Sequence, residues 1–302
     1  MEPLERYRDL VDDFAAFEAA CRRPLPTTVR VHREAAEPAT VVRALASEGV
    51  EAEALGWAED VLEVDTDAPG LTAPDFLGWT HAMEAASCLP VPALDPEPGA
   101  VVWDTCAAPG GKTGHLVDAM DDRGLVLATD ASLGRLSALR FNTERLGATC
   151  TVVDHADARH VSLDPLGIDA VDAALVDAPC SSEGTVRKRP DVLDEWSLEQ
   201  VRSLAGLQRD ILARAVAATR PGGRVVYATC TFAPEENEAV VDAVLGSHDC
   251  ELEAVALPVP TADGVTRWRG ETFDPSLARA RRIYPHLSDT GGFFVAALRV
   301  GA

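Results

Sequence analysis

The sequence predicts an α/β protein built around a doubly wound, mostly parallel sheet, with a small α+β domain in front of it. Three observations predict this class. Short apolar runs alternate with helical patterns from about residue 100 onward. Aspartate and cysteine residues fall where several of these runs end, which is where such sheets bind ligands. Residues 1–70 lack that alternation, so we expect them to form the small domain and residues 71–302 to form the sheet domain.

The expected elements of the small domain follow from periodicity and from the breaks in it. Apolar residues at helical spacing indicate a helix that ends before two closely spaced prolines. A β-α-β order follows, and its helix is closed by Gly49. The elements are a helix over Leu4–Ala20, a strand over Thr28–His32, a helix over Ala39–Ser47 and a strand over Val61–Val64, with a linker over Asp67–Pro74.

The sheet domain is expected to alternate strands and helices to its end. Each strand is a short, mainly apolar run, and Pro221-Gly222-Gly223 stops the longest helix. The strands are Ala100–Thr105, Leu125–Asp130, Cys150–Val153, Ala170–Asp177, Arg224–Thr229 and Phe293–Leu298. The helices are one that begins at about Lys112, and Ser132–Leu146, Leu198–Thr219 and Pro234–Leu245.

The charge balance is strongly acidic. The chain of 302 residues has a formal net charge of −22 at pH 7, and its only lysines are Lys112 and Lys188. Taken alone, this charge argues against nucleic acid as a partner. An acidic, lysine-poor composition is also typical of proteins that stay soluble in a salty cytoplasm, and we interpret the charge in that way.

Neither the N-terminus nor the cysteines indicate a membrane or export. There is no run of about 18 apolar residues, and the polar segment Met1–Leu10 does not resemble a secretory signal. The seven cysteines form no CxxC pair, so no zinc or other metal site is expected. An odd number of thiols favours a reducing, cytoplasmic location.

A loop rich in small residues, from Asp104 to Thr113, follows the first strand of the sheet domain. A phosphate loop would need glycine at Cys106, and a dinucleotide fingerprint would need it at Pro109, so each fails at one required position. The third ligand class is S-adenosylmethionine, because small residues admit its methionine part and a helix N-terminus favours its carboxylate. Asp130, at the end of the next strand, is placed to accept hydrogen bonds from ribose hydroxyls.

Two cysteines fall at the ends of neighbouring expected strands. Asp177-Ala178-Pro179-Cys180 closes one strand and Thr229-Cys230 closes the other, so both thiols are expected at one cleft. A thiolate that adds to carbon 6 of cytosine makes carbon 5 able to accept a methyl group. Asp177 is the candidate for protonating or hydrogen-bonding ring N3, and the second thiol can assist release. The residues alone do not rank the two cysteines.

This chemistry needs a base outside its stack, so a flexible or single-stranded nucleotide is the expected substrate. Basic clusters in this acidic chain are candidates for holding the phosphate backbone. The clusters are Arg187-Lys188-Arg189, Arg267 with Arg269, and Arg279 with Arg281 and Arg282. From these we predict RNA contacts by Arg187, Lys188 and Arg282.

Together these motifs resemble those of the RsmB/Nop/Sun (Fmu) family of RNA cytosine-5 methyltransferases, over about residues 25–300. The segment Asp177–Lys188 is similar to the family's fourth motif, and Tyr227–Thr231 with Glu236–Glu238 is similar to its sixth. Glu84–Ser87 and Gly291–Ala296 match the flanking motifs. The resemblance implies a Rossmann-like class I methyltransferase sheet, and the acidic composition is similar to that of halophilic archaeal members.

The resemblance also implies roles for single residues. Cys230 attacks the base, Cys180 assists release, and Asp157 lies on the adenine side of the cofactor. Thr231 departs from the family's serine, and His32 departs from the asparagine of its Arg-x-Asn pattern. The implied cofactor contacts are Cys106, Ala107, Ala108, Pro109, Gly110, Gly111, Lys112, Asp130, Arg135, Asp157 and Asp177.

Several functional alternatives stay open. The first is an RNA-binding assembly factor that keeps the fold without the activity, although both cysteines are present. A nucleotide-dependent oxidoreductase and a DNA cytosine methyltransferase are the others, and the Thr-Cys motif disfavours the DNA enzyme. The resemblance favours transfer RNA over ribosomal RNA as the partner, and no oligomer is required.

The acidic composition predicts that salt stabilises the fold. Raising KCl from about 0.1 M to about 1 M shortens the Debye length from ~10 Å to ~3 Å, which screens repulsion among acidic side chains. We therefore expect the midpoint of thermal unfolding, followed by circular dichroism, to rise with KCl. Maximal stability in dilute buffer would contradict the interpretation.

Overall fold

The computed structural model describes residues 2–301, and the chain divides into two compact units. The contiguous unit contains residues 26–175. The split unit contains residues 1–25 together with residues 176–302. The sequence placed its boundary after residue 70, whereas the first 25 residues group with the C-terminal half of the chain.

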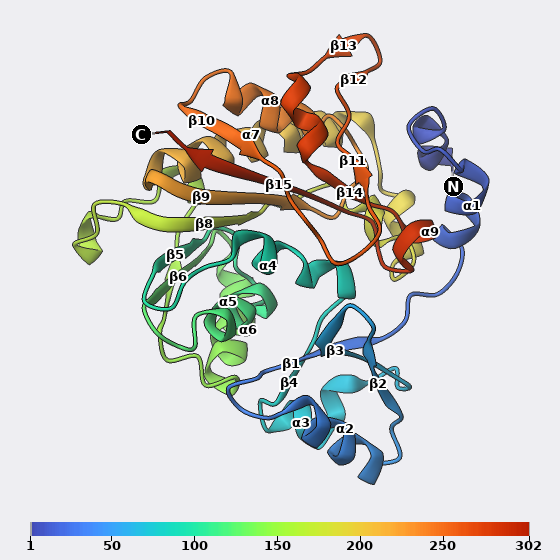
Figure 1. Cartoon of the computed structure of the whole chain (residues 1–302), viewed down its shortest axis with the longest axis vertical. Helices are drawn as coiled ribbons and strands as arrows, with labels where there is room; N and C mark the ends of the chain where they lie inside the picture. Colours follow the sequence, from blue (N-terminus) through green and yellow to red (C-terminus); the bar gives the residue numbers. More distant parts are fainter. Residues whose placement is uncertain (1, 302) are drawn as a thin grey trace. The chain divides into compact units, whose positions relative to one another are not determined.

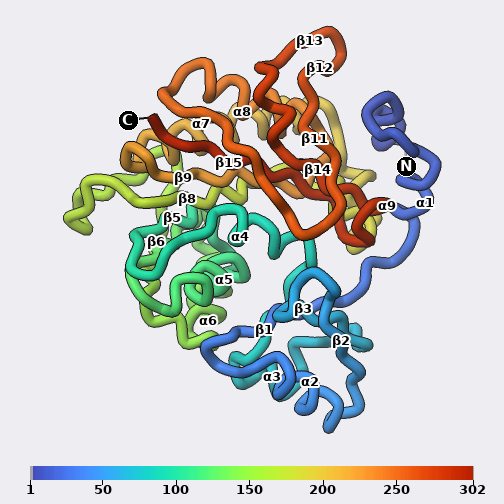
Figure 2. Tube along the Cα trace, viewed as in Figure 1, coloured from blue at the N-terminus to red at the C-terminus, as the bar shows by residue number. Residues whose placement is uncertain are grey.

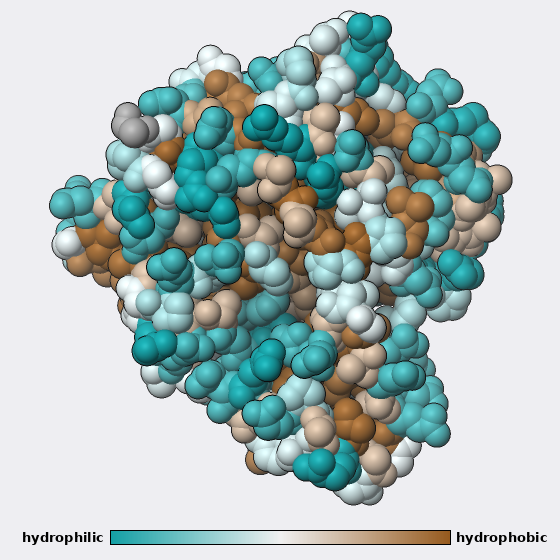
Figure 3. Space-filling model, in the orientation of Figure 1, coloured by the Kyte–Doolittle hydropathy of each residue, from teal (hydrophilic) through white to brown (hydrophobic). Residues whose placement is uncertain are grey.

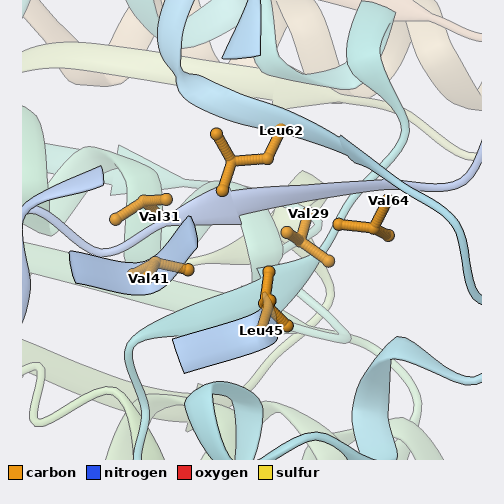
Figure 4. Close-up of a cluster of buried hydrophobic side chains, with 6 residues drawn as sticks. All are labelled: Val29, Val31, Val41, Leu45, Leu62 and Val64. Carbon is orange, nitrogen blue, oxygen red and sulfur yellow. The ribbon is translucent and has the colours of Figure 1, made fainter. Parts of the chain in front are cut away.

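A four-stranded antiparallel sheet opens the contiguous unit, with strand order β2-β3-β1-β4. One face of it packs on helix α2, and Figure 4 shows the shared apolar cluster, in which Val29 and Leu62 meet Val41 and Leu45. The elements are β1 (Thr28–Val31), α2 (Pro38–Ser47), β2 (Ala52–Leu55), β3 (Ala58–Val64), the short α3 (Ala73–Phe76) and β4 (Thr80–Ala82).

The rest of the contiguous unit is a parallel α/β arrangement in which β5 pairs with β6 and β8, and β6 with β7 (Figure 1). Buried valine, leucine and alanine side chains line β5, β6 and β8, as expected for strands covered on both faces, whereas β7 is largely exposed. The elements are α4 (Pro90–Leu94), β5 (Val101–Asp104), α5 (Gly111–Ala119), β6 (Leu125–Asp130), α6 (Leu133–Arg145), β7 (Thr151–His155) and β8 (Val171–Asp177).

A buried ion cluster joins the four-stranded sheet to α5. Arg30 of β1 and His32, which follows β1, both pair with Asp118 of α5. Arg30 is fully buried and His32 nearly so. The histidine at the family's asparagine position therefore serves a contact inside the contiguous unit.

The split unit is built around β9, which pairs antiparallel with β15, and β15 pairs in turn with β10 and β14. Helices α7 and α8 pack on each other, and α1 lies beside α9 although the two are far apart in sequence (Figure 2). The elements are α1 (Phe14–Cys21), α7 (Leu198–Ala218), β9 (Thr219–Thr229), α8 (Glu238–Leu245), β10 (Cys250–Glu253), β11 (Ala262–Asp263), the hairpin β12 (Arg267–Trp268) and β13 (Glu271–Thr272), β14 (Arg281–Ile283), α9 (Pro285–Ser288) and β15 (Phe293–Val300).

Within the split unit the strand order is β11-β14-β15-β9, with β10 paired to β15, and within the contiguous unit it is β8-β5-β6-β7. Every expected strand is present within a few residues, and Leu125–Asp130 matches at both ends. The expected helix over Leu4–Ala20 is wrong as one element. A 3-10 helix spans Glu2–Tyr7, and α1 starts at Phe14 because Asp13 accepts a hydrogen bond from Ala16 N and caps it.

Hydrophilic side chains cover most of the face shown in Figure 3. Within residues 2–301, no helix combines the length and the apolar character needed to cross a bilayer.

The apolar cluster of the four-stranded sheet predicts a stability effect. Leu62 is fully buried in it, so Leu62→Ala removes packed methyl groups and should lower the free energy of unfolding by about 2–5 kcal/mol. Leu71 is 88% exposed and is the matched control. Leu71→Ala should change the free energy of unfolding by less than about 0.5 kcal/mol. Urea unfolding measures both, and equal effects would contradict the assigned core.

Candidate active site

The two predicted cysteines meet in the split unit. Cys180 follows β8, Cys230 follows β9, and their sulfur atoms are 3.3 Å apart. The Cys230 thiol also donates a hydrogen bond to Ser182 Oγ at 3.6 Å. Both cysteines are partly exposed, so a substrate can reach them. The structure therefore brings together two thiols that lie 50 residues apart in the sequence.

A backbone contact without room for a side chain joins the loops that carry these thiols. Gly184 N donates to Cys230 O at 3.0 Å, and Gly292 N donates to Gly184 O at 2.8 Å. A Cβ at Gly184 would lie 2.7 Å from Cys230 O and still closer to Gly292 O. Only glycine allows the approach, which explains the small residue in the loop after Cys180.

Asn237 holds the residues on both sides of Cys230. Its side-chain oxygen accepts from Thr229 Oγ1 at 2.5 Å, and its amide donates to Thr231 O at 3.0 Å. Asn237 is fully buried. The side chain therefore fixes the backbone at the point where the nucleophile candidate leaves β9.

Two buried carboxyl groups lie behind the thiols. Glu183 and Glu236 both contact Ser181 Oγ, and Glu183 also accepts from Thr231 Oγ1 at 2.6 Å. The pKa of Glu236 is raised to about 7, because burial and the nearby Glu183 outweigh the hydrogen bonds from Ser181 and Gln208 that lower it. Glu236 is therefore poised between its charged and neutral forms at neutral pH.

The two thiols differ in their proton affinity. The hydrogen bond with Cys230 raises the pKa of Cys180 well above its usual value, and burial raises it further. Cys180 therefore keeps its proton.

Asp177 is the last residue of β8 and is half-buried. It lies three residues before Cys180, in the short segment that leads from the strand to the thiol.

The predicted cofactor loop of the contiguous unit is held by its own backbone. Ala107 N donates to Thr129 O at 2.9 Å, and Ala108 N donates to Asp130 Oδ2 at 3.2 Å. Gly110 has a φ of 108° and is the N-cap of α5, a conformation that favours glycine. Cys106 and Lys112 are half-buried and Pro109 is exposed, whereas Gly111 is buried against His81 and Met83.

The charged residues expected at the cofactor have defined partners. Asp130 accepts from Ser132 N at 2.9 Å and lies 3.4 Å from Arg135, which donates to Ala108 O. Hydrogen bonds from Arg159 lower the pKa of Asp157 to about 2, so this carboxylate is charged. Both acids follow strands of the parallel sheet, Asp130 ending β6 and Asp157 lying beyond β7.

The loop fits the methionine end of S-adenosylmethionine by its chemistry. In the described part of the chain, no side chain forms a capping hydrogen bond at the N-terminus of α5, and a helix N-terminus favours a carboxylate. Ribose hydroxyls are donors that Asp130 can accept.

Two of the three predicted RNA contacts are corrected. Arg282 is 1% exposed and pairs with Glu238 while donating to Phe232 O, so it is part of the core. Arg187 is also buried and donates to Arg23 O, Pro24 O and Thr290 O. Charge alone suggested a surface role for them, but both guanidinium groups serve the interior. Lys188 is exposed.

Lys188 lines a cavity of about 510 Å³ within the split unit. Arg22 and Arg23 line it too, and both are exposed. Arg22 pairs with Glu18 at 2.8 Å and Arg23 with Asp289 at 3.5 Å. A larger cavity of about 660 Å³ in the contiguous unit is lined by acidic residues, among them Glu51, Glu53 and Asp65.

Sequence reasoning singled out the thiols but not their supports. Tyr7, from the 3-10 helix near the N-terminus, donates to Glu183, and Gln208 of α7 donates to Glu236 at 2.7 Å. The segment Glu236–Glu238, a few residues after β9, contains two acids and an asparagine, and all three are fully buried. Among the described residues, no group of three or more histidine, cysteine or acidic side chains is arranged to hold a metal ion.

Comparison with known proteins gives concordant matches. A family model described as 16S rRNA methyltransferase RsmB/F matches residues 91–299. The chain is 34% identical over 300 residues to the tRNA (cytosine(49)-C(5))-methyltransferase of Pyrococcus abyssi, which covers 98% of this chain and 94% of that protein. It is 35% identical over 296 residues to human 28S rRNA (cytosine(4447)-C(5))-methyltransferase, covering 96% of this chain. The chain spans 36% of the length of that human relative.

Solved structures share the fold. A methyltransferase homolog protein from Pyrococcus horikoshii superposes with a TM-score of 0.85 at 31% identity, covering 98% of this chain and 93% of that one. NSun6 from Pyrococcus horikoshii, solved with the S-adenosylmethionine analogue SFG, superposes with a TM-score of 0.82 at 22% identity and covers 98% and 96%. The predicted Rossmann-like class I methyltransferase fold is therefore confirmed.

The close approach at Gly184 predicts that a methyl group there lowers the stability of the fold, whereas a methyl group at an open glycine does not. Gly184→Ala would push the Cys180 loop away from Cys230 O, and should lower the unfolding free energy by about 1–3 kcal/mol. Gly206, in the middle of α7, has open space at its Cβ, so Gly206→Ala should be neutral or stabilise by about 0.5–1 kcal/mol. Thermal unfolding compares the two, and a tolerated Gly184→Ala would refute the proposed contact.

Proposed function

The chain belongs to the RsmB/F family of S-adenosylmethionine-dependent RNA methyltransferases, and we propose that it methylates carbon 5 of cytosine in RNA through a covalent cysteine adduct. The observation that supports this most directly is the 3.3 Å separation of the Cys180 and Cys230 sulfurs. Two partly exposed thiols at this distance suit a reaction in which one group bonds to the base and the other helps to release it.

In this proposal Cys230 is the nucleophile. Its thiolate adds to carbon 6 of the cytosine ring, which raises the electron density at carbon 5. The raised pKa of Cys180 supports the assignment, since Cys180 then remains a thiol that can donate a hydrogen bond to the Cys230 sulfur, 3.3 Å away. After methyl transfer, water takes the proton from carbon 5 and the electrons of that bond re-form the ring double bond. The Cys230 sulfur leaves carbon 6 with a proton from the Cys180 thiol, and solvent then returns a proton to Cys180.

Asp177 is proposed to hydrogen-bond or protonate ring N3 of the same cytosine. It ends β8 three residues before Cys180, and protonation at N3 stabilises the adduct at carbon 6. Asp177 is also proposed as a cofactor contact, in keeping with the family resemblance.

S-adenosylmethionine, when bound, supplies the electrophilic methyl group. The residues proposed to hold it are those of the 106–112 loop with Asp130, Arg135 and Asp157. The amides at the N-terminus of α5 favour its carboxylate, and Asp130 accepts from the ribose hydroxyls. Asp157 is assigned to the adenine side, and Arg135 orders the loop through Ala108 O.

RNA is proposed to contact the cavity lined by Arg22, Arg23 and Lys188. These exposed cations follow α1 and the Cys180 loop, and they stand out in a chain of net charge −22. The cavity with Glu51, Glu53 and Asp65 repels phosphate by comparison. Arg22 and Arg23 thus replace Arg187 and Arg282 as candidates for backbone contacts, and Lys188 is kept.

Transfer RNA is the favoured substrate class. The relative of matching length, covered over 94%, is named for a transfer RNA position, whereas the human ribosomal RNA enzyme is more than twice as long as the matched region. The competing function is an RNA-binding assembly factor on the same fold. The close pair of thiols does not support this alternative, because a factor that only binds RNA does not need the thiols.

The assignment of the two thiols predicts which variant traps RNA. Cys180→Ala should accumulate a covalent protein–RNA adduct, because the adduct forms but is released slowly. Cys230→Ala should form none. Denaturing gel electrophoresis with labelled transfer RNA and S-adenosylmethionine measures both, and the double variant is the control. Trapping by Cys230→Ala would reverse the roles.

The reaction itself predicts a missing modification. Bisulfite sequencing of RNA from a strain that lacks the gene should show the loss of one or more 5-methylcytosines, and restoring the wild-type gene should return them. A Cys230→Ala gene should not. An unchanged pattern of 5-methylcytosine would favour the assembly-factor alternative.

A further inference from the structure

The residues beside the two thiols belong to one buried hydrogen-bond network. Ser181, next to Cys180, and Thr231, next to Cys230, have their hydroxyl oxygens 2.9 Å apart. Ser181 Oγ also contacts Glu183 Oε2 and Glu236 Oε1, and Thr231 Oγ1 lies 2.6 Å from Glu183 Oε2. The spacing of the thiols is therefore coupled to a cluster of four buried side chains.

The outer sides of the two carboxyl groups are already occupied by donors. Glu183 Oε1 accepts from Tyr7 Oη and from Trp196 Nε1 at 3.1 Å. Glu236 Oε2 accepts from Ser181 N at 3.0 Å and from Gln208 Nε2 at 2.7 Å. The inner oxygens, Glu183 Oε2 and Glu236 Oε1, are left to the hydroxyls of Ser181 and Thr231.

Counting protons shows that this arrangement needs one more. Three oxygen–oxygen contacts join the hydroxyls to the inner carboxyl oxygens, yet the two hydroxyls supply only two hydrogens. If both carboxyl groups were charged, the single Ser181 hydrogen would leave one carboxylate oxygen facing its lone pairs. A proton on Glu236 Oε1 solves this, because Glu236 then donates to Ser181, and Ser181 and Thr231 both donate to Glu183.

We propose that Glu183 and Glu236 hold one proton between them and act as positioning residues that set the separation of the Cys180 and Cys230 thiols. Like charges this close in a buried site cannot both be ionised at low cost, which favours the shared proton. Loss of the proton would leave two carboxylates repelling across Ser181. The loops of the two cysteines would then separate.

Glu236 itself is the group in this cluster that is expected to change its protonation near pH 7. The uncharged neighbours are Ser181, Thr231 and Gln208. The titratable and charged groups that face the pair are Cys180, Tyr7 and, beyond Tyr7, Arg6 with Glu235. Burial raises the pKa of Tyr7 well above 10, and that of Cys180 is raised as well, so both stay protonated at neutral pH. Burial and Glu183 together raise the pKa of Glu236 to about 7, so Glu236 titrates first.

The test measures thiol geometry without any RNA. Diamide, a two-electron thiol oxidant, takes up the two protons and two electrons that the thiols lose as the Cys180–Cys230 disulfide forms. Peptide mass spectrometry gives the rate. Glu236→Gln keeps a neutral donor toward Ser181 at every pH. Below pH 7 the wild type and Glu236→Gln should form the disulfide at nearly the same rate. Above pH 7 the ratio of the wild-type rate to the Glu236→Gln rate should decrease, approaching a ten-fold decrease for each pH unit.

Two further variants make the result specific. Glu235→Gln removes a neighbouring carboxylate that pairs with Arg6 instead, and should keep the wild-type pH dependence. Tyr7→Phe removes one donor to Glu183 and keeps the ring, so the pair should hold its proton more tightly and the fall should begin about one pH unit higher. If Glu236→Gln does not fold, the Tyr7→Phe shift tests the same point. A pH-independent ratio, or no shift with Tyr7→Phe, overturns the proposal.

The link to methyl transfer rests on the proposed function, and a second assay tests it separately. The pH profile of methyl transfer to transfer RNA should lose its descending limb near pH 7 in Glu236→Gln. If the wild type transfers no methyl group to any RNA, the proposed function fails, while the disulfide rates still decide the role of the carboxyl pair. A limb that persists in Glu236→Gln overturns the positioning role.

Discussion

The split unit depends on one buried constraint, the contact between the loops that follow β8 and β9. Each loop offers a small or hydroxyl side chain at the contact, Gly184 and Ser181 on one side and Thr231 on the other. The partners of Glu183 and Glu236 behind the contact are hydroxyl, amide and indole groups. A buried acid satisfied in this way loses less of its hydration energy when neutral than when charged. The positions of the thiols and the protonation of the carboxyl groups therefore depend on the same set of buried contacts.

Much of the fold could be predicted from the sequence because its central strands are apolar, short and bounded by glycine or aspartate. Leu125–Asp130 is the clearest case, following Gly124 and ending in a buried aspartate. Several very short strands were missed for the opposite reason. Strands such as Ala262–Asp263 and Arg281–Ile283 have two or three residues and no alternation, so only pairing with a neighbour defines them. The apolar spacing of Leu4–Ala20 continued across the Asp13 cap, and periodicity alone could not locate that break.

The candidate site residues could be predicted where a short sequence motif contains them. Cys180, Cys230 and the loop before α5 are recognised by their neighbours in sequence, and the structure brings the two sulfurs to 3.3 Å from each other. Tyr7 could not be found in this way, since its partner Glu183 is 176 residues away. Arg187 and Arg282 were misassigned because a basic residue in an acidic chain suggests exposure, whereas sequence carries no direct measure of burial. Their carbonyl and carboxylate partners come from distant segments.

The composition of the split unit has a consequence for biosynthesis. Residues 1–25 pack with elements that lie beyond residue 175, so the entire contiguous unit is translated between the two parts. A nascent chain can complete the α/β half on the ribosome while α1 and Tyr7 still lack their neighbours. Final assembly then awaits the arrival of α9 and β15, and long-range pairing of this kind is a slow step. Until that closure, the thiol-bearing loops have no support from the amino-terminal segment, and an unfinished chain lacks the assembled thiol site.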